Sequence, residues 1–133
     1  MRVTVDTNVL LRTFVDDDPD QSLAAFKALE AAEVVAISLQ ALCEFVWVLH
    51  RQYATSRSDI AAALRQLLET RNVVVNRPAV EAGLAVLEAG GDFADGIIAY
   101  DGNWLGGETF LTFDKKAAKI LSSQGQATEL LKG

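Results

Sequence analysis

The sequence is poor in the residues that build disulfide frameworks, zinc sites and histidine-based active sites. Among its 133 residues there is one cysteine, Cys43, and one histidine, His50. A single cysteine cannot form an intrachain disulfide, and no Cys/His cluster of the zinc-binding kind is present. His50 has no Ser or Cys nucleophile in a recognisable setting, so a hydrolase triad is unsupported.

The chain also lacks long apolar runs and an excess of basic residues. No run approaches the roughly 20 apolar residues that span a bilayer, and residues 1–11 contain no signal-peptide-like region. With 12 Lys and Arg against 18 Asp and Glu, the formal net charge is −6. This charge argues against non-specific, charge-driven binding to nucleic acid. It does not exclude a nuclease, because bound cations neutralise an acidic site. Because the chain has only one cysteine, we expect a protein of the reducing cytoplasm.

Apolar residues are abundant, at 50% of the chain. The length suits a single domain over residues 1–133. Such a surplus of apolar side chains on a small domain indicates a partner or self-association.

Short β-branched segments alternate with helical patterns along the whole chain. The pattern predicts strands at residues 2–6, 34–38, 72–75 and 109–113, with a short fifth edge strand at 127–131. Between them it predicts helices at about 8–14, 19–30, 38–53, 57–70, 78–88, 92–100 and 115–122. In the second of these helices we expect an inner side that carries, on it or near it, Leu23, Ala24, Phe26 and Leu29. The alternation predicts an α/β domain with a mainly parallel central sheet of four to five strands.

Four acidic residues lie at the end of, or inside, otherwise apolar segments: Asp6, Glu44, Asp95 and Asp114. A carboxylate beside a buried apolar run costs several kcal/mol unless it is paired or holds a metal. Brought together by a fold, the four would form an oxygen-rich site for a hard cation such as Mg²⁺ or Mn²⁺. The pattern therefore indicates metal-assisted phosphoryl chemistry.

Three of these positions also have an ordinary structural interpretation. Asp6 and Asp114 each end a predicted strand, where α/β proteins bind ligands, but each also suits a helix N-cap. Asp92 is a good N-cap, and Asp95 three residues later resembles a capping-box acid. Both interpretations stay open at this point.

Glu44 is the only charged residue of the segment 41–49. A helix that is apolar all round is buried, so we expect Glu44 to be buried, either in a functional site or paired with Arg51 or Arg65. Basic residues follow two of the acids along the chain. They would either contact phosphates or simply be solvated. The residues singled out as possible phosphate contacts are Arg12, Lys115 and Lys116.

Four motifs in this order resemble the PIN-domain family, and within it the VapC-type toxins of type II toxin–antitoxin pairs. They are Asp6-Thr7-Asn8 after an opening strand, Glu44 in an apolar helix followed by Trp47-Val48-Leu49, Asp92-Phe93-Ala94-Asp95, and Thr112-Phe113-Asp114-Lys115-Lys116.

The resemblance implies a three-layer α/β/α fold and a Mg²⁺- or Mn²⁺-dependent endoribonuclease that acts through metal-activated water. It implies that the metal ligands, for one or two ions, are Asp6, Glu44, Asp95 and Asp114. The supporting polar residues would be Thr7, Asn8, Asp92 and Thr112. It further implies a homodimer and a cognate antitoxin whose C-terminal segment blocks the active site.

Other protein classes fit less well. A haloacid-dehalogenase-like phosphatase needs a second acid two residues after the first, and position 8 is Asn8. A receiver-type signalling domain needs a lysine at the end of a late strand, where this chain has Asp114. Closer alternatives are a PIN nuclease of RNA processing or of DNA outside a toxin system, and a non-catalytic antitoxin-binding regulatory module.

Overall fold

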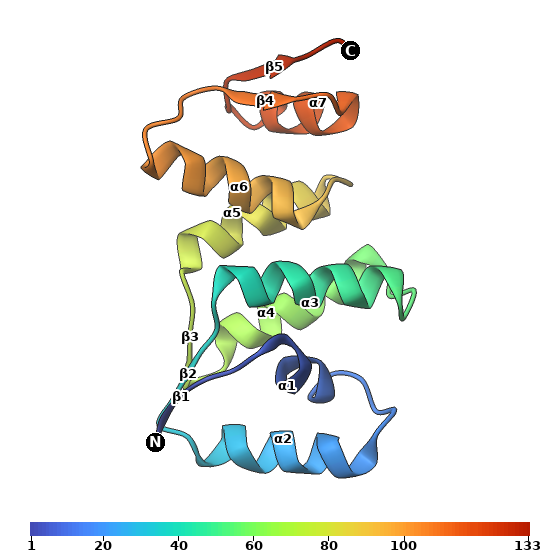
Figure 1. The fold of residues 1–133 in the computed structure, drawn as a ribbon, viewed down its shortest axis with the longest axis vertical. Helices are drawn as coiled ribbons and strands as arrows, with labels where there is room; N and C mark the ends of the chain where they lie inside the picture. Colours follow the sequence, from blue (N-terminus) through green and yellow to red (C-terminus); the bar gives the residue numbers. More distant parts are fainter. The chain divides into compact units, whose positions relative to one another are not determined.

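The computed structural model describes all 133 residues, which divide into two compact units, Met1–Arg77 and Pro78–Gly133. In Figure 1 the first unit runs from blue to green and the second from yellow to red. The chain is α/β, as predicted, and every strand pairs in parallel. The five strands lie in two sheets, of three and two strands.

Unit 1 has a three-stranded sheet in the order β1-β2-β3. Its strands are β1 (Arg2–Thr4), β2 (Val34–Ala36) and β3 (Val73–Val74), with Val35 paired to both Val3 and Val73. The four helices of the unit are α1 (Thr7–Arg12), α2 (Pro19–Ala31), α3 (Leu39–Arg51) and α4 (Arg57–Glu69). Each strand was predicted at its correct place but is shorter than the apolar segment that contains it.

Each helix of unit 1 begins at a residue whose side chain accepts a backbone N–H of the first turn. Such a cap satisfies one of the N–H groups that a helix leaves without an internal partner. The four capping residues are Asp6, Asp18, Ser38 and Ser56. Helix α2 also has Pro19 at its first position, where the fixed φ of proline suits a helix start.

Helix α2 does not turn the predicted side inward. Leu23 and Phe26 are 56% and 58% exposed, and Ala25 is the buried residue of this helix. Apolar residues occur at helical spacing on more than one face of this helix, and several of them are alanines. Because its apolar residues do not mark one face clearly, the sequence pattern gave the wrong side.

Unit 2 contains a two-stranded parallel sheet of β4 (Phe110–Thr112) and β5 (Thr128–Leu130), in which Leu111 pairs with Glu129. Its helices are α6 (Phe93–Trp104), α7 (Lys115–Ser123) and α5 (Arg77–Glu88), which begins at the boundary between the units. Helix α6 extends four residues beyond its predicted end. No helix in either unit combines the length and the apolar composition that crossing a membrane requires.

Helices α5 and α6 lie in very close contact at two glycines. A Cβ placed on Gly96 would lie 2.5 Å from the carbonyl oxygen of Ala82 and 2.8 Å from the Cα of Gly83. Both neighbours are backbone atoms, so they cannot yield as a flexible side chain would. This contact sets the path of α6, which carries Asp92 and Asp95 at its N-terminal end.

Gly96→Ala should therefore destabilise the protein by about 1–3 kcal/mol, the usual effect of overpacking. Gly102 is a matched control on the same helix, because a Cβ added there has nothing within 4 Å. Gly102→Ala should stabilise by up to about 1 kcal/mol, through helix propensity alone. Urea unfolding of both variants measures the difference, and equal effects would contradict the close contact at Gly96.

Candidate functional site

Asp6 joins the first strand to the first helix. Its Oδ1 accepts the backbone N–H of Val9 at 2.9 Å and so caps α1. The side chain is exposed, and Oδ2 accepts no hydrogen bond from the protein. The carboxylate therefore serves as a cap through one oxygen and has the other free for a ligand.

Glu44 lies close to the start of α1. The hydroxyl of Thr7, the first residue of α1, donates to Oε2 of Glu44 on α3 at 3.0 Å. This bond joins residues 37 positions apart in the sequence and orients the carboxylate of Glu44. Thr7, which was predicted as a supporting residue, thus contacts one of the predicted acids.

The prediction that Glu44 is buried was wrong, because its side chain is exposed in this structure. Helix α3 buries one face, and its other face carries Glu44 together with Trp47, which is 55% exposed. The buried residues of the helix are Ala41, Leu42, Phe45, Val46 and Leu49. Arg51 does not pair with Glu44; its guanidinium lies over the ring of Trp47, 5.7 Å from the ring centre.

Two acids of unit 2 are also helix caps. Oδ1 of Asp92 accepts the N–H of Ala94 at 3.1 Å at the start of α6. Oδ1 of Asp114 accepts the N–H groups of Lys116 and Ala117, at 2.8 and 3.2 Å, at the start of α7. In both carboxylates Oδ2 accepts no hydrogen bond from the protein, as in Asp6.

Thr112 at the end of β4 helps to fix Asp114. Its hydroxyl oxygen accepts the backbone N–H of Asp114 at 3.0 Å. The bond holds the turn between the strand and α7, from which the Asp114 side chain projects. Thr112 therefore supports this acid from within unit 2.

Asp95 is the acid with a perturbed environment. It lies in the first turn of α6, is half-buried, and accepts no hydrogen bond. Burial raises the pKa of Asp95, and the negative charges of Asp92 and Asp114 raise it further. Asp92 and Asp114 are thus close enough to act on the charge of Asp95, and a bound cation would offset their effect.

The free oxygens suit a hard divalent cation. Carboxylate oxygen is the ligand that Mg²⁺ and Mn²⁺ prefer, and Asp6, Asp92 and Asp114 each have one oxygen without a hydrogen bond. Within either unit alone, no three acidic, histidine or cysteine side chains are grouped for metal binding. Of the predicted quartet, Asp6 and Glu44 belong to unit 1, and Asp95 and Asp114 belong to unit 2.

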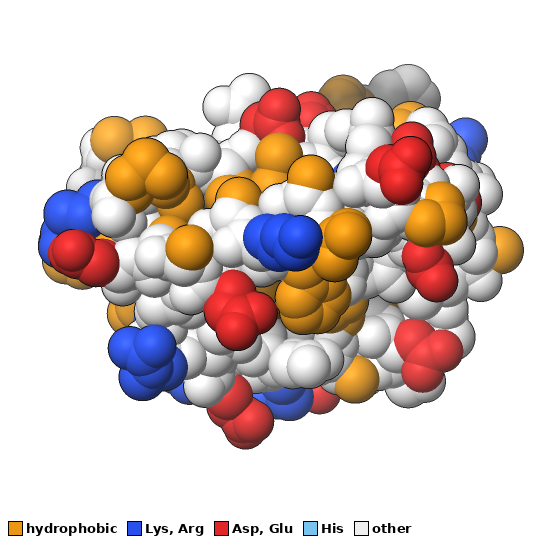
Figure 2. Space-filling view, turned by 90° about the horizontal axis from the view of Figure 1, so that it is seen from below, with side chains coloured by type: hydrophobic (Ala, Val, Ile, Leu, Met, Phe, Trp, Pro, Cys, Tyr) orange, Lys and Arg blue, Asp and Glu red, His pale blue; other side chains and the backbone are white.

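The basic residues singled out from the sequence differ in exposure. Lys115 and Lys116 are exposed on the first turn of α7. Arg12 has a side chain only 14% exposed and forms an ion pair with Asp17. On the face shown in Figure 2, the Lys and Arg side chains lie apart from one another among acidic and apolar groups. This face offers no broad basic surface for nucleic acid.

Two polar residues near Arg12 were not anticipated from the sequence. The hydroxyl of Tyr53, just after α3, donates to Oδ2 of Asp17 at 2.8 Å. No role was predicted for Asp17, and Tyr53 was predicted only as the end of a helix. The sequence held no signal for this contact, because the two residues lie 36 positions apart.

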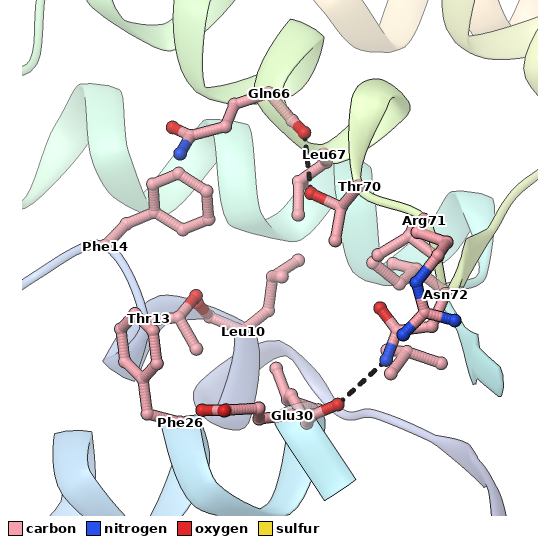
Figure 3. Close-up of a pocket in the computed structure, with 14 residues that line it drawn as sticks. Leu10, Thr13, Phe14, Phe26, Glu30, Gln66, Leu67, Thr70, Arg71 and Asn72 are labelled. Atoms are coloured by element: carbon pink, nitrogen blue, oxygen red, sulfur yellow. Dashed lines mark hydrogen bonds between the residues drawn. The ribbon is translucent and has the colours of Figure 1, made fainter. Parts of the chain in front are cut away.

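Unit 1 also contains a pocket of about 580 Å³ between α1, α2 and α4. Figure 3 shows Leu10, Phe14 and Phe26 on its apolar side, with the polar Arg71 and Asn72 on the other. The amide of Asn72 donates to the carbonyl oxygens of Leu29 and Ala32, at 2.9 and 3.0 Å. None of the site residues predicted from the sequence lines this pocket.

Comparison with known proteins identifies the family. The model of the PIN domain matches residues 3–121, a range that includes all four predicted acids and crosses the boundary between the units. A search of curated proteins found no match. PIN domains are typically nucleases that use divalent metal ions. The match covers most of the sequence, and the chain therefore belongs to the PIN-domain family.

Proposed function

We propose that this protein is a Mg²⁺- or Mn²⁺-dependent endoribonuclease and the toxin of a type II toxin–antitoxin pair. The observation that carries the proposal is the half-buried Asp95, whose pKa is raised by burial and by its acidic neighbours. Perturbed carboxylates of this kind concentrate at functional sites. Family membership supplies the nuclease fold, and the order of the motifs along the chain supports the toxin assignment.

In this proposal the acidic quartet predicted from the sequence serves one reaction. Asp6, Asp95 and Asp114 would hold one or two cations, and Asp92 would add negative charge to the site. Glu44, oriented by Thr7, is a further ligand or orients the attacking water. A bound divalent cation supplies activated water and offsets the charge of the phosphate. The products are a 5′-phosphate and a 3′-hydroxyl.

Substrate binding must rely on a few local contacts, because the chain has a net charge of −6. Lys115 and Lys116 are exposed directly after Asp114 and are the lysines proposed to contact phosphates. Selectivity among RNAs would come from loop shape, stacking and base-edge contacts rather than from a general electrostatic attraction.

A homodimer and a cognate antitoxin, whose C-terminal segment covers the active site, are part of the same proposal. Large exposed apolar side chains on both units support protein partners. Trp47 is 55% exposed on unit 1, and Trp104 and Leu105 are 76% and 89% exposed on unit 2.

The proposal is tested with the purified chain, free of partners, incubated with a panel of RNAs and with single-stranded DNA. We expect Mg²⁺-dependent cleavage of RNA to 5′-phosphate ends, its loss in EDTA, and its recovery on addition of Mn²⁺. Induced expression in a bacterial host should arrest growth. Preferential cleavage of DNA, or RNA cleavage without growth arrest, would favour a nuclease outside a toxin system. Failure of the metal-loaded protein to cleave any nucleic acid would favour a binding module.

A further inference from the structure

Helix α1 depends on contacts with the rest of unit 1 for its position. It has six residues, too few to be stable alone, yet it presents Asp6, Thr7 and Asn8 in succession. At its N-terminal end Thr7 is bonded to Glu44. At its C-terminal end Arg12 is bonded to Asp17, which belongs to the segment between α1 and α2. The helix is therefore held at both ends by polar contacts.

Tyr53 extends the contact at the C-terminal end. Its hydroxyl donates to the second oxygen of Asp17 at 2.8 Å, so both carboxylate oxygens are engaged. This hydrogen bond, followed by the charge of Arg12, holds the pKa of Asp17 below its ordinary value. Asp17 thus stays ionised at neutral pH, and its charge keeps the guanidinium of Arg12 in place.

Arg12 in turn orients the side chain of Asn8. Its Nη2 donates to Oδ1 of Asn8 at 3.4 Å, one turn back along α1. A guanidinium has donors only, so the amide must turn its oxygen toward Arg12 and its Nδ2 away. Asn8 is exposed, and Nδ2 donates to no group of the protein.

The position of the Arg12 side chain has an energetic cost. The Nε of Arg12 is buried without a hydrogen-bond partner, and a buried unsatisfied donor is destabilising. Locally unfavourable features of this kind, such as a buried donor without a partner, are expected at functional positions. The outcome of the arrangement is an exposed, oriented amide donor two residues after Asp6.

We propose that Asn8 donates a hydrogen bond from Nδ2 to a phosphate oxygen of the RNA, and that Arg12, Asp17 and Tyr53 are positioning residues that fix its amide. The proposal rests on the nuclease function proposed above. A neutral donor suits this place, because it binds phosphate without forming an ion pair with Asp6. Arg12 is unsuited to contact phosphate itself, since its side chain is 14% exposed and is paired with Asp17.

A double-mutant cycle on RNA cleavage tests the proposal. Asn8→Ala should lower kcat about 10–100-fold, the effect of losing a hydrogen bond to a charged group. Tyr53→Phe removes one hydroxyl and should lower kcat about three- to tenfold, a coupling of ordinary size. In the Asn8→Ala background, Tyr53→Phe should have no further effect. Additive losses would overturn the proposal, because Tyr53 would then act independently of Asn8.

Tyr100→Phe is the matched control, because it removes a phenolic hydroxyl from a half-exposed tyrosine of unit 2. It should leave kcat unchanged in both backgrounds. The melting temperatures of all variants show whether a lower kcat comes from a general loss of stability instead of a changed orientation of the Asn8 amide. A kcat effect of Tyr100→Phe equal to that of Tyr53→Phe would also contradict the assignment.

Side-chain amide resonances of Asn8 give a readout that needs no cleavage. They should shift in Tyr53→Phe but not in Tyr100→Phe, and they should shift when an oligoribonucleotide is added to the wild type in Ca²⁺. If the Asn8 amide resonances do not shift when RNA is added, the inference is overturned, even if the protein is an active nuclease. Resonances that respond to both Tyr53→Phe and RNA in a protein without cleavage would support it, and only the nuclease proposal would fail.

Discussion

Asp6→Asn should abolish RNA cleavage and leave the fold unchanged. Asparagine caps helices as well as aspartate does, so the bond from Val9 N–H to Oδ1, 2.9 Å in the wild type, can persist. What disappears is the negative charge of the carboxylate and the anionic Oδ2. Residues that merely orient metal ligands affect activity about 10–100-fold, so loss of a ligand should reduce the rate by more than about 100-fold. Initial cleavage rates in Mg²⁺ and thermal melting measure the two effects.

Asp18→Asn is the control for this variant. Asp18 caps α2 in the same unit by accepting the N–H of Gln21 at 3.1 Å, and it is not one of the candidate acids. The same substitution there should change neither activity nor melting temperature. Asp6→Ala should lose the cap as well as the charge, with about 1 kcal/mol less stability. Mg²⁺-dependent cleavage retained by Asp6→Asn would remove Asp6 from the site.

The caps and the strands were predictable because their signals are local. Asp18 followed by Pro19, and Ser38 before the apolar segment of α3, place two helix starts to the residue. Strand positions follow from β-branched runs in the same way. These features depend on neighbours within a few residues, and such neighbours are visible in the sequence.

Features that depend on distant residues were not predictable. The composition of α3 gave no sign that Glu44 and Trp47 share an exposed face, because a pattern shows how apolar a helix is but not what lies across each side. The bond between Tyr53 and Asp17 joins residues 36 positions apart. Neither residue belongs to a motif, so only the fold reveals that they meet.

The sequence also presented capping and metal binding as competing roles, and the geometry makes them compatible. Asp6, Asp92 and Asp114 each cap a helix through Oδ1 alone. The cap fixes the direction of the carboxylate, and the remaining oxygen keeps its lone pairs. A helix N-terminus also favours an anion beside it. Capping therefore leaves one oxygen of each side chain free for the metal binding that we propose.

Asp95→Asn should make the metal-free protein more stable at neutral pH while abolishing cleavage. The pKa of Asp95 is raised in the fold, first by burial and then by Asp92 and Asp114, so folding favours its protonated form. Its contribution to the free energy of unfolding is present below the ordinary carboxyl pKa and is lost as pH rises through the raised value. The stability advantage of Asp95→Asn should therefore grow through that interval and level off above it. Such an exchange of stability for activity is common at active sites.

Melting curves in EDTA across this pH range measure the effect, with Glu129→Gln, at an exposed acid of the same unit, as the control without this pH dependence. Adding Mg²⁺ should raise the melting temperature of the wild type more than that of Asp95→Asn, because a cation stabilises the state that binds it. The difference in melting temperature between Asp95→Asn and the wild type should thus become smaller or change sign as the Mg²⁺ concentration increases. A wild type more stable than Asp95→Asn in EDTA at neutral pH would show that Asp95 is stabilised by its surroundings, and would contradict its assignment to an electrostatically strained metal site.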